Sequence, residues 1–113
     1  MKIIVTFTRP DTTAPFFYQE FADHLVVTTL HDKFEAASGF LGKEILVEED
    51  LKIEVAMNFK SMSEFLLFAK SNQQLLDMRR ELIEEWCQTN GHTFDHRIIT
   101  DEPTYSDIPL PRG

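Results

Sequence analysis

The residues of this sequence that could do chemistry together are mostly large and apolar, with a few polar groups among them. Helix and strand periodicity places all of them between two helical regions and a sheet, with Phe17 beside them. An aromatic pocket with few polar groups is the usual site for a small organic molecule. The candidate ligand-binding residues are Phe7, Phe21, Met57, Phe68, Arg79, Trp86 and His96.

Each part of this set also has a purely structural interpretation. The aromatic residues could simply fill a small core. His96 alternates with Phe94 and Ile98 and so shares their inward face, where a hydrogen-bonded core histidine is favoured over a general base. Arg79 is either a structural charge with a partner or a clamp for an anion. The sequence alone leaves these alternatives open.

Several other kinds of chemistry have no support in the residues. We find no glycine-rich phosphate loop, no Ser-His-Asp signature and no metal-ligand cluster, so no cofactor and no metal are expected. His24 and His31 share one helical face, but seven residues of helix rise about 10 Å, which is too far for one ion. The single cysteine, Cys87, follows Trp86 in a helical pattern and is expected to pack in the core.

Composition and charge narrow the class of protein. The 113 residues make one domain, and 42% hydrophobic residues with ten phenylalanines suit a folded core. The net charge of −8 opposes binding to nucleic acid. The chain shows no apolar run of transmembrane length, no signal peptide and no cysteine pair, so we expect a cytoplasmic protein without membrane contact.

The candidate residues depend on a central pair of strands in residues 39–61, joined by the acidic turn at residues 48–50. The second strand alternates cleanly between apolar and polar residues. The preferred pairing puts Leu41, Ile45 and Val47 of the first strand on the apolar face, because the buried face sets the register.

Helical patterns lie on both sides of this pair. Residues 12–37 predict one helix, either with a bend at the β-branched residues 26–29 or curved to follow a twisted sheet. The capping box at residues 61–64 begins a second helical region. We expect that region to break near residues 71–74, because a continuous helix would drive Asn72 and Arg79 into the core.

Outer strands at residues 2–9 and 92–100 complete the order β-α-β-β-α-β, which predicts a ferredoxin-like α+β domain over residues 1–100. One four-stranded antiparallel sheet, ordered 4-1-3-2, should carry both helical regions on one face. The Pro-rich residues 101–113 should form an extended C-terminal tail ordered against a second subunit. The expected helix-facing residues are Ile3, Val5, Phe7, Ile53, Val55 and Met57. The expected open face carries Ile4, Thr6, Leu46, Glu54, Ala56 and Asn58. Because half of this set is apolar, we expect the face to be covered by a second subunit.

The stretch Gly39-Phe40-Leu41-Gly42, the ending Phe59-x-Ser61 and the later Ser71 resemble the dimeric α/β-barrel superfamily, in its antibiotic-biosynthesis-monooxygenase-like branch. The resemblance implies a homodimer with paired sheets and a small aromatic or lipophilic ligand between sheet and helices. Some members oxidise such ligands without metal or flavin, and some degrade haem. Many carry a histidine three residues before the serine, where this chain has Phe68.

Two functions follow as hypotheses. The first is a small-molecule-binding protein that resembles the cofactor-independent monooxygenases of this superfamily. The second is a non-catalytic homodimeric structural or protein-interaction module. An internal pocket open to solvent would favour the first, and a fully packed interior beneath Trp86 and His96 would favour the second.

Overall fold

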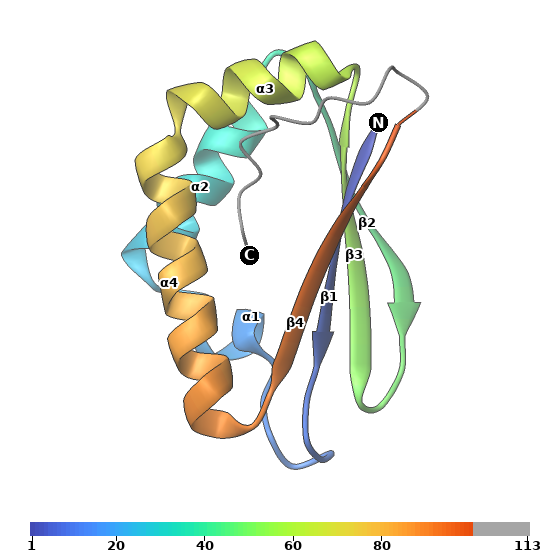
Figure 1. The fold of residues 1–113 in the computed structure, drawn as a ribbon, viewed down its shortest axis with the longest axis vertical. Helices are drawn as coiled ribbons and strands as arrows, with labels where there is room; N and C mark the ends of the chain where they lie inside the picture. The colour runs from blue at the N-terminus through green and yellow to red at the C-terminus, as the bar shows by residue number, and fades with distance from the viewer. Residues whose placement is uncertain (101–113) are drawn as a thin grey trace.

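The computed structural model of the chain describes residues 1–100 and confirms the predicted ferredoxin-like α+β fold (Figure 1). Its elements in chain order are β1 (Lys2–Thr8), α1 (Phe17–Glu20), α2 (Leu25–Ala36), β2 (Phe40–Glu48), β3 (Lys52–Phe59), α3 (Met62–Ser71), α4 (Gln73–Asn90) and β4 (Thr93–Ile99). The four strands form one antiparallel sheet in the order β2-β3-β1-β4, as predicted. The predicted tail at residues 101–113 lies outside the described residues.

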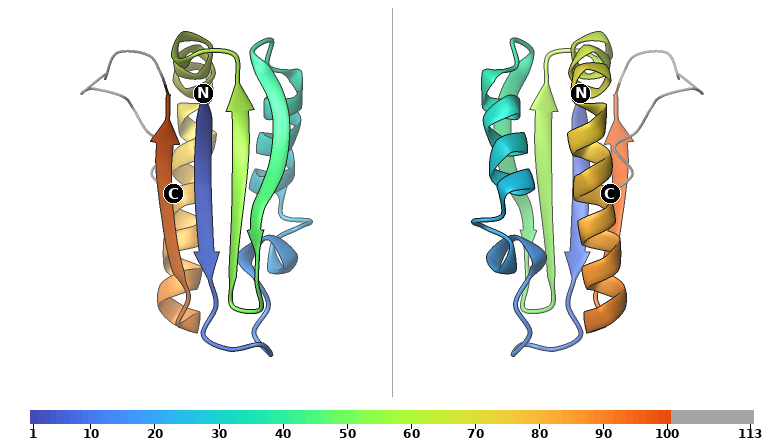
Figure 2. Two further views of the ribbon diagram at one scale, coloured as in Figure 1. Left: turned by 90° about the vertical axis from the view of Figure 1, so that its right-hand side faces the viewer. Right: turned by 90° about the vertical axis from the view of Figure 1, so that its left-hand side faces the viewer.

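The helices cover one face of the sheet and leave the other face bare (Figures 1 and 2). In Figure 2, α2 lies behind β2, and α4 lies behind β1 and β4. The predicted helix-facing residues of β1 and β3 are confirmed, because they are buried in the core or, for Val55, packed against it. Hydrophobic alternation therefore determines which face of β1 and β3 is buried against the helices.

The predicted single helix over residues 12–37 is wrong. Asp11 accepts hydrogen bonds from the backbone N–H groups of Thr13 and Ala14, which makes a turn where the helix was expected to start. The chain leaves helical geometry again after α1, and His24 caps α2 by accepting the N–H of Val26 at 3.2 Å from Nδ1. Residues 26–29 lie inside α2, where Val26 is buried and tertiary packing outweighs its weak helix propensity.

The predicted face of the first central strand is also wrong in part. Irregularities at Leu41 and Leu46 shift the pairing of β2 with β3 twice. Leu41 is consequently 62% exposed, and Val47 pairs with Glu54, a residue of the open face. Only Ile45 keeps its expected place beside the helices. Each bulge adds one residue, so the side chains after it change faces.

The first bulge turns a charged side chain towards the helices. Gly42 follows Leu41 with a φ of +123°, a conformation that favours glycine. The next residue, Lys43, pairs with the buried Met57, and further along β2 Glu48 pairs with Ile53. Lys43 and Glu48 therefore project to the helix-covered side of the sheet edge, whereas alternation from Phe40 would put Lys43 on the open face, and alternation from Ile45 would put Glu48 there.

The predicted break in the second helical region is confirmed. α3 ends at Ser71, α4 begins at Gln73, and Asn72 between them has a φ of −123°. The Asn72 side chain donates to the carbonyl oxygen of Phe68 at 2.9 Å, so its amide is satisfied. The break thus removes Asn72 from the core, whereas Arg79 still faces the interior.

Gly39 and Ser61 in the family-like motif have local structural roles. A Cβ atom on Gly39 would lie 2.4 Å from the Cβ of Glu64, so only glycine allows β2 to start this close to α3. Ser61 caps α3, since its hydroxyl accepts the N–H of Glu64 at 3.2 Å. These two positions fix how the central strands join the second helical region.

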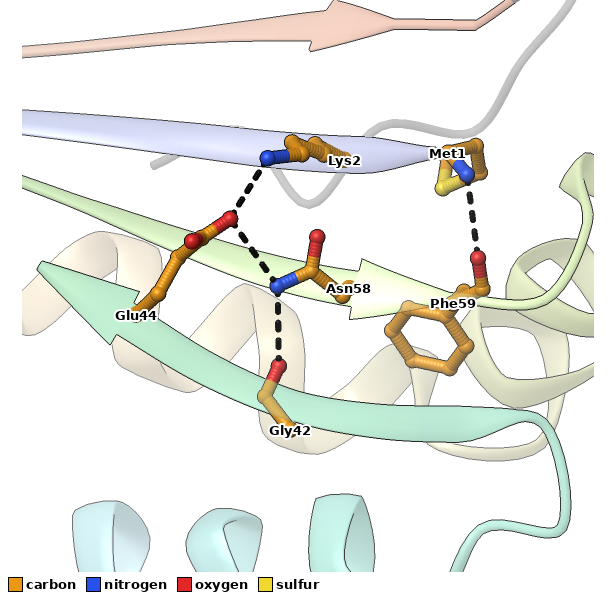
Figure 3. A network of polar contacts seen from close by, with 6 residues as sticks. All are labelled: Met1, Lys2, Gly42, Glu44, Asn58 and Phe59. Atoms are coloured by element: carbon orange, nitrogen blue, oxygen red, sulfur yellow. Dashed lines mark hydrogen bonds and ion pairs between the residues drawn. The ribbon is translucent and has the colours of Figure 1, made fainter. Parts of the chain in front are cut away.

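The open face carries a polar network at its β1-β3-β2 end (Figure 3). Lys2 Nζ lies 2.6 Å from Glu44 Oε1, and Asn58 Nδ2 lies 3.4 Å from the same oxygen and from the carbonyl of Gly42. The hydrogen bonds from Lys2 and Asn58 lower the pKa of the Glu44 carboxyl. This network holds three strands of the sheet in one arrangement.

Apolar residues lie in the middle of the same face. Ile4 is 2% exposed and Ala56 is not exposed at all, although neither belongs to the core on the helix side. Beside them, Glu54 accepts hydrogen bonds from Thr6 at 3.1 Å and from Arg97 at 3.5 Å. The open face therefore has covered apolar residues at its centre, and charged groups beside them that already have partners.

Candidate functional site

A cavity of about 540 Å³ lies between the helices and the sheet. Its walls come from β1, β2, β3, α1, α2 and one residue of α4. The apolar lining is Val5, Phe7, Phe17, Ala22, Val27, Leu30, Phe34, Ile45, Ile53, Val55 and Met57, and the polar lining is Tyr18, Thr28, His31, Asp32, Lys43, Glu48 and Arg79. The exposed residues among the polar lining, such as His31 and Asp32, bring the cavity to the molecular surface.

Three titratable side chains form a line at the rim of this cavity. Lys43 Nζ lies 3.1 Å from Nδ1 of His31, and Nε2 of the same ring lies 3.9 Å from Oε1 of Glu35. A protonated Lys43 can only donate, so this contact assigns Nδ1 as the acceptor and leaves the ring N–H on the Glu35 side. The 3.1 Å contact is a hydrogen bond, whereas the 3.9 Å between His31 and Glu35 is an ion-pair distance and too long for direct proton transfer.

Arg79 contributes a second cation from α4. Burial lowers the pKa of Arg79 to about 10, so the guanidinium stays charged at neutral pH. The pKa of Lys43 is also lowered, first by burial and then by the positive charge of Arg79, while Glu35 opposes the shift. The charge of Arg79 therefore acts on Lys43 at the rim of the cavity.

The predicted ligand-binding residues divide between several places. Phe7, Met57 and Arg79 line the cavity, as does Phe17. Phe21 and Trp86 line a separate hollow of about 300 Å³ with Leu82, Glu85, Thr89 and Asn90. The structure thus brings three of the seven predicted residues together at the larger site.

The remaining two predicted residues lie elsewhere. Phe68 is 6% exposed, and its ring lies 4.3 Å from that of Phe34 and 5.7 Å from that of Phe59, so it packs in the core. His96 lies on β4 opposite Val5, with its ring 6.2 Å from that of Phe94. It shares the helix-facing side with Phe94, as the alternation predicted.

Sequence reasoning missed the polar rim of the cavity. The sequence pattern indicates only an exposed residue or half of a metal pair for His31, and it places Lys43 in the first central strand and Glu48 in the acidic turn. The glycine before Lys43 was the one signal of the bulge, since glycine inside a strand often marks one. The expected register already put Lys43 on the face of Leu41 and Ile45, but the pairing of Glu48 with Ile53 was needed to show that Glu48 shares this face.

Residues 1–100 contain neither a metal-ligand cluster nor a membrane-spanning helix. No group of three or more His, Cys, Asp or Glu side chains could hold a metal ion there. No helix in this part of the chain is both long and apolar enough to cross a bilayer. Cys87 is buried in the core, and burial raises the pKa of its thiol, so the predicted packing role fits.

His92 is a buried titratable group outside the cavity. Its ring lies 3.9 Å from the ring of Trp86, and within the described part of the chain its Nε2 atom has no hydrogen-bond partner. Burial lowers the pKa of His92, the charge of Asp11 raises it, and the charge of Arg9 lowers it. The neutral ring is therefore the form that suits the fold.

His92 should make stability depend on pH. Its folded-state pKa lies below the ordinary 6.5, so the unfolded chain binds this proton more readily between the two values. The free energy of unfolding should therefore fall as the pH drops from about 7 towards 5. His92→Phe keeps a ring against Trp86 and should flatten this dependence. Urea denaturation of both proteins measures the two slopes, and equal slopes would contradict the assignment.

The comparisons with known proteins bear on the fold. No protein-family model matches the sequence, and no significant match was found among curated proteins. A solved structure does match, that of a mutant of SnoaB, a cofactor-independent oxygenase from Streptomyces nogalater. The match has a TM-score of 0.56 and 18% sequence identity, and it covers 94% of this chain and 96% of the SnoaB chain.

This similarity establishes the fold. The chain has the ferredoxin-like architecture that the sequence resemblance to the dimeric α/β-barrel superfamily implied. At 18% identity the match does not carry the neighbour's site residues over to this chain. The site therefore has to be argued from the residues present here.

Proposed function

We propose that this protein binds a small aromatic or lipophilic molecule in the cavity between α2 and the sheet, and oxidises it with O₂ without a cofactor. The observation that carries the proposal is the cavity itself. Its volume of about 540 Å³ suits a small organic ligand, and apolar side chains make up most of its walls. Phe7, Phe17 and Phe34 offer ring faces for stacking.

The oxygenase part of the proposal draws support from the fold shared with SnoaB, a cofactor-independent oxygenase. The apolar walls would exclude water from a bound ring system. His31, which is hydrogen-bonded to Lys43 and exposed at the cavity rim, would exchange a proton between the ligand and solvent. Trp86 and His96 do not line the cavity themselves, although Phe17 beside Trp86 and Val5 opposite His96 do.

Filling the cavity should abolish ligand binding. Val27 lies on α2, is half-buried and lines the cavity, so Val27→Trp would occupy the space that the ligand needs. We expect the affinity for a naphthol to fall by at least about tenfold, measured by calorimetry. Leu67→Trp is the matched control, because Leu67 is 64% exposed on α3 and lines neither hollow.

Oxygen consumption tests the reaction itself. Protein treated with a chelator should consume O₂ with one or more members of a panel of naphthols and larger hydroxylated aromatic compounds, and Val27→Trp should not. Binding without any O₂ consumption across the panel would reduce the proposal to a small-molecule-binding protein. Equal binding by wild type and Val27→Trp would contradict the choice of cavity.

We also propose that the protein forms a homodimer through the open face of the sheet. Ile4 and Ala56 put apolar side chains at the centre of this face, and the helices leave the face free to meet a second sheet. The charged groups on this face, such as Glu54 and Arg97, are already paired with each other. Burying them in an interface would therefore not leave an unpaired charge without water. The same face is what a non-catalytic interaction module would use.

A further inference from the structure

We propose that the ligand of the cavity carries an acidic group, and that Lys43 of β2 and Arg79 of α4 bind this group together. The proposal rests on the proposed function, since it takes the cavity as the ligand site. It goes beyond that function by assigning the chemical class of the ligand, an apolar ring system with one anionic substituent, and its orientation.

The geometry of β2 places Lys43 for this role. The bulge at Leu41 and the positive φ of Gly42 bring Lys43 opposite Met57, on the side of the sheet that the helices cover. The contact of 3.1 Å between Lys43 Nζ and His31 Nδ1 holds the ammonium at the cavity rim. The lysine is therefore positioned before any ligand arrives.

Arg79 reaches the same cavity from a different element. It is the one residue of α4 in the cavity lining. Burial disfavours its charge, and its charge in turn disfavours that of Lys43. An anion bound to both would offset the mutual repulsion and the loss of hydration at once. A guanidinium and an ammonium can also donate several hydrogen bonds to one acid group.

The carboxylates around the cavity decide the orientation of the ligand. Glu48 lines the cavity five positions beyond Lys43 on β2, which at about 3.3 Å per residue places it roughly 15 Å away. Asp32 lines the cavity from the exposed side of α2, where solvent screens its charge, and Glu35 lies behind His31. The acid group therefore belongs at the Lys43–Arg79 end, and the rings extend along the apolar wall.

Two matched fluorescent probes test this assignment. 1-Anilinonaphthalene-8-sulfonate carries an anionic sulfonate, and N-phenyl-1-naphthylamine has the same ring system without it. Lys43→Met should weaken binding of the sulfonate about tenfold and change binding of the neutral probe less than about twofold. The control Lys60→Met removes an exposed lysine that does not line the cavity and should change neither affinity.

Two further variants guard against misinterpretation. Val27→Trp should abolish binding of both probes, which places them in the cavity. Arg79→Gln should lose affinity for the sulfonate as Lys43→Met does, with circular dichroism confirming that each variant is folded. If Arg79→Gln does not fold, the comparison of the two probes in Lys43→Met alone decides whether the cations bind the acidic group.

The possible results separate this proposal from the one on which it rests. Loss of affinity for the sulfonate alone in Lys43→Met supports the acid-binding pair. Equal changes for both probes, or no change for either, would overturn it while leaving the cavity as a site for neutral rings. A wild-type protein that bound neither probe would contradict the proposed function, and the assignment of an acidic ligand would be lost with it.

Discussion

Phe59→Ala is expected to lower the free energy of unfolding by about 3–5 kcal/mol, the usual cost of removing a buried aromatic ring. Phe59 is 1% exposed. Its ring centroid lies within 6.0 Å of those of four other phenylalanines, Phe34, Phe40, Phe65 and Phe68. These rings come from α2, β2 and α3, so the cavity left by the alanine would loosen three elements at once.

Urea denaturation of wild type and variant measures this difference, and the dependence of the unfolding free energy on urea concentration should be the same for both proteins. Small domains have a total stability of about 5–15 kcal/mol, so this loss would be a large fraction of it. Leu67→Ala is the control, since Leu67 is 64% exposed and its truncation should cost less than about 0.5 kcal/mol. A loss below about 1 kcal/mol for Phe59→Ala would mean that the ring cluster is not packed as described.

Ala56→Arg is expected to turn a dimer into a monomer or to make the protein insoluble. Ala56 pairs with Ile4 on one side and with Glu44 on the other, in the middle of the open face, and its own surface is fully covered. A long charged side chain there would stand out of a flat interface and separate the two sheets. The helix-covered side, and with it the cavity, would keep its residues.

Light scattering coupled to gel filtration measures the outcome. The chain has a mass of 13.2 kDa, so a wild-type dimer would give 2 × 13.2 = 26.4 kDa at micromolar concentration. Leu25→Arg is the matched control, because Leu25 is 77% exposed at the start of α2 and lies on the helical side of the molecule. A wild-type protein that is monomeric at this concentration would rule out the proposed interface.

Local patterns in the sequence were enough for the order of the elements and for the architecture. Alternation along β1 and β3 identified their buried faces, because a central strand packed on one side has a period of two. The capping box at Ser61 and Glu64 and the polar Asn72 located α3 and the break after it. Right-handed connections then left one order for the sheet, which the structure has.

The candidate site depended on features that no local pattern contains. The bulges at Leu41 and Leu46 exist only in the pairing of β2 with β3, and they decide that Lys43 and Glu48 face the cavity. The bulge at Leu41 leaves one residue unpaired, and only the partner strand shows where that happens. An edge strand exposed to water on much of its length also has weak alternation, so its register cannot be read from burial.

The helical layer was decided by tertiary structure in the same way. Propensity suggested one helix, but the turn at Asp11 delays its start, the cap at His24 begins a separate helix, and α2 then packs beside β2. The cavity is the space left between α2, the sheet and Arg79. Its shape follows from how these elements pack, and packing joins residues that are far apart in the chain, whereas periodicity reports only on neighbours.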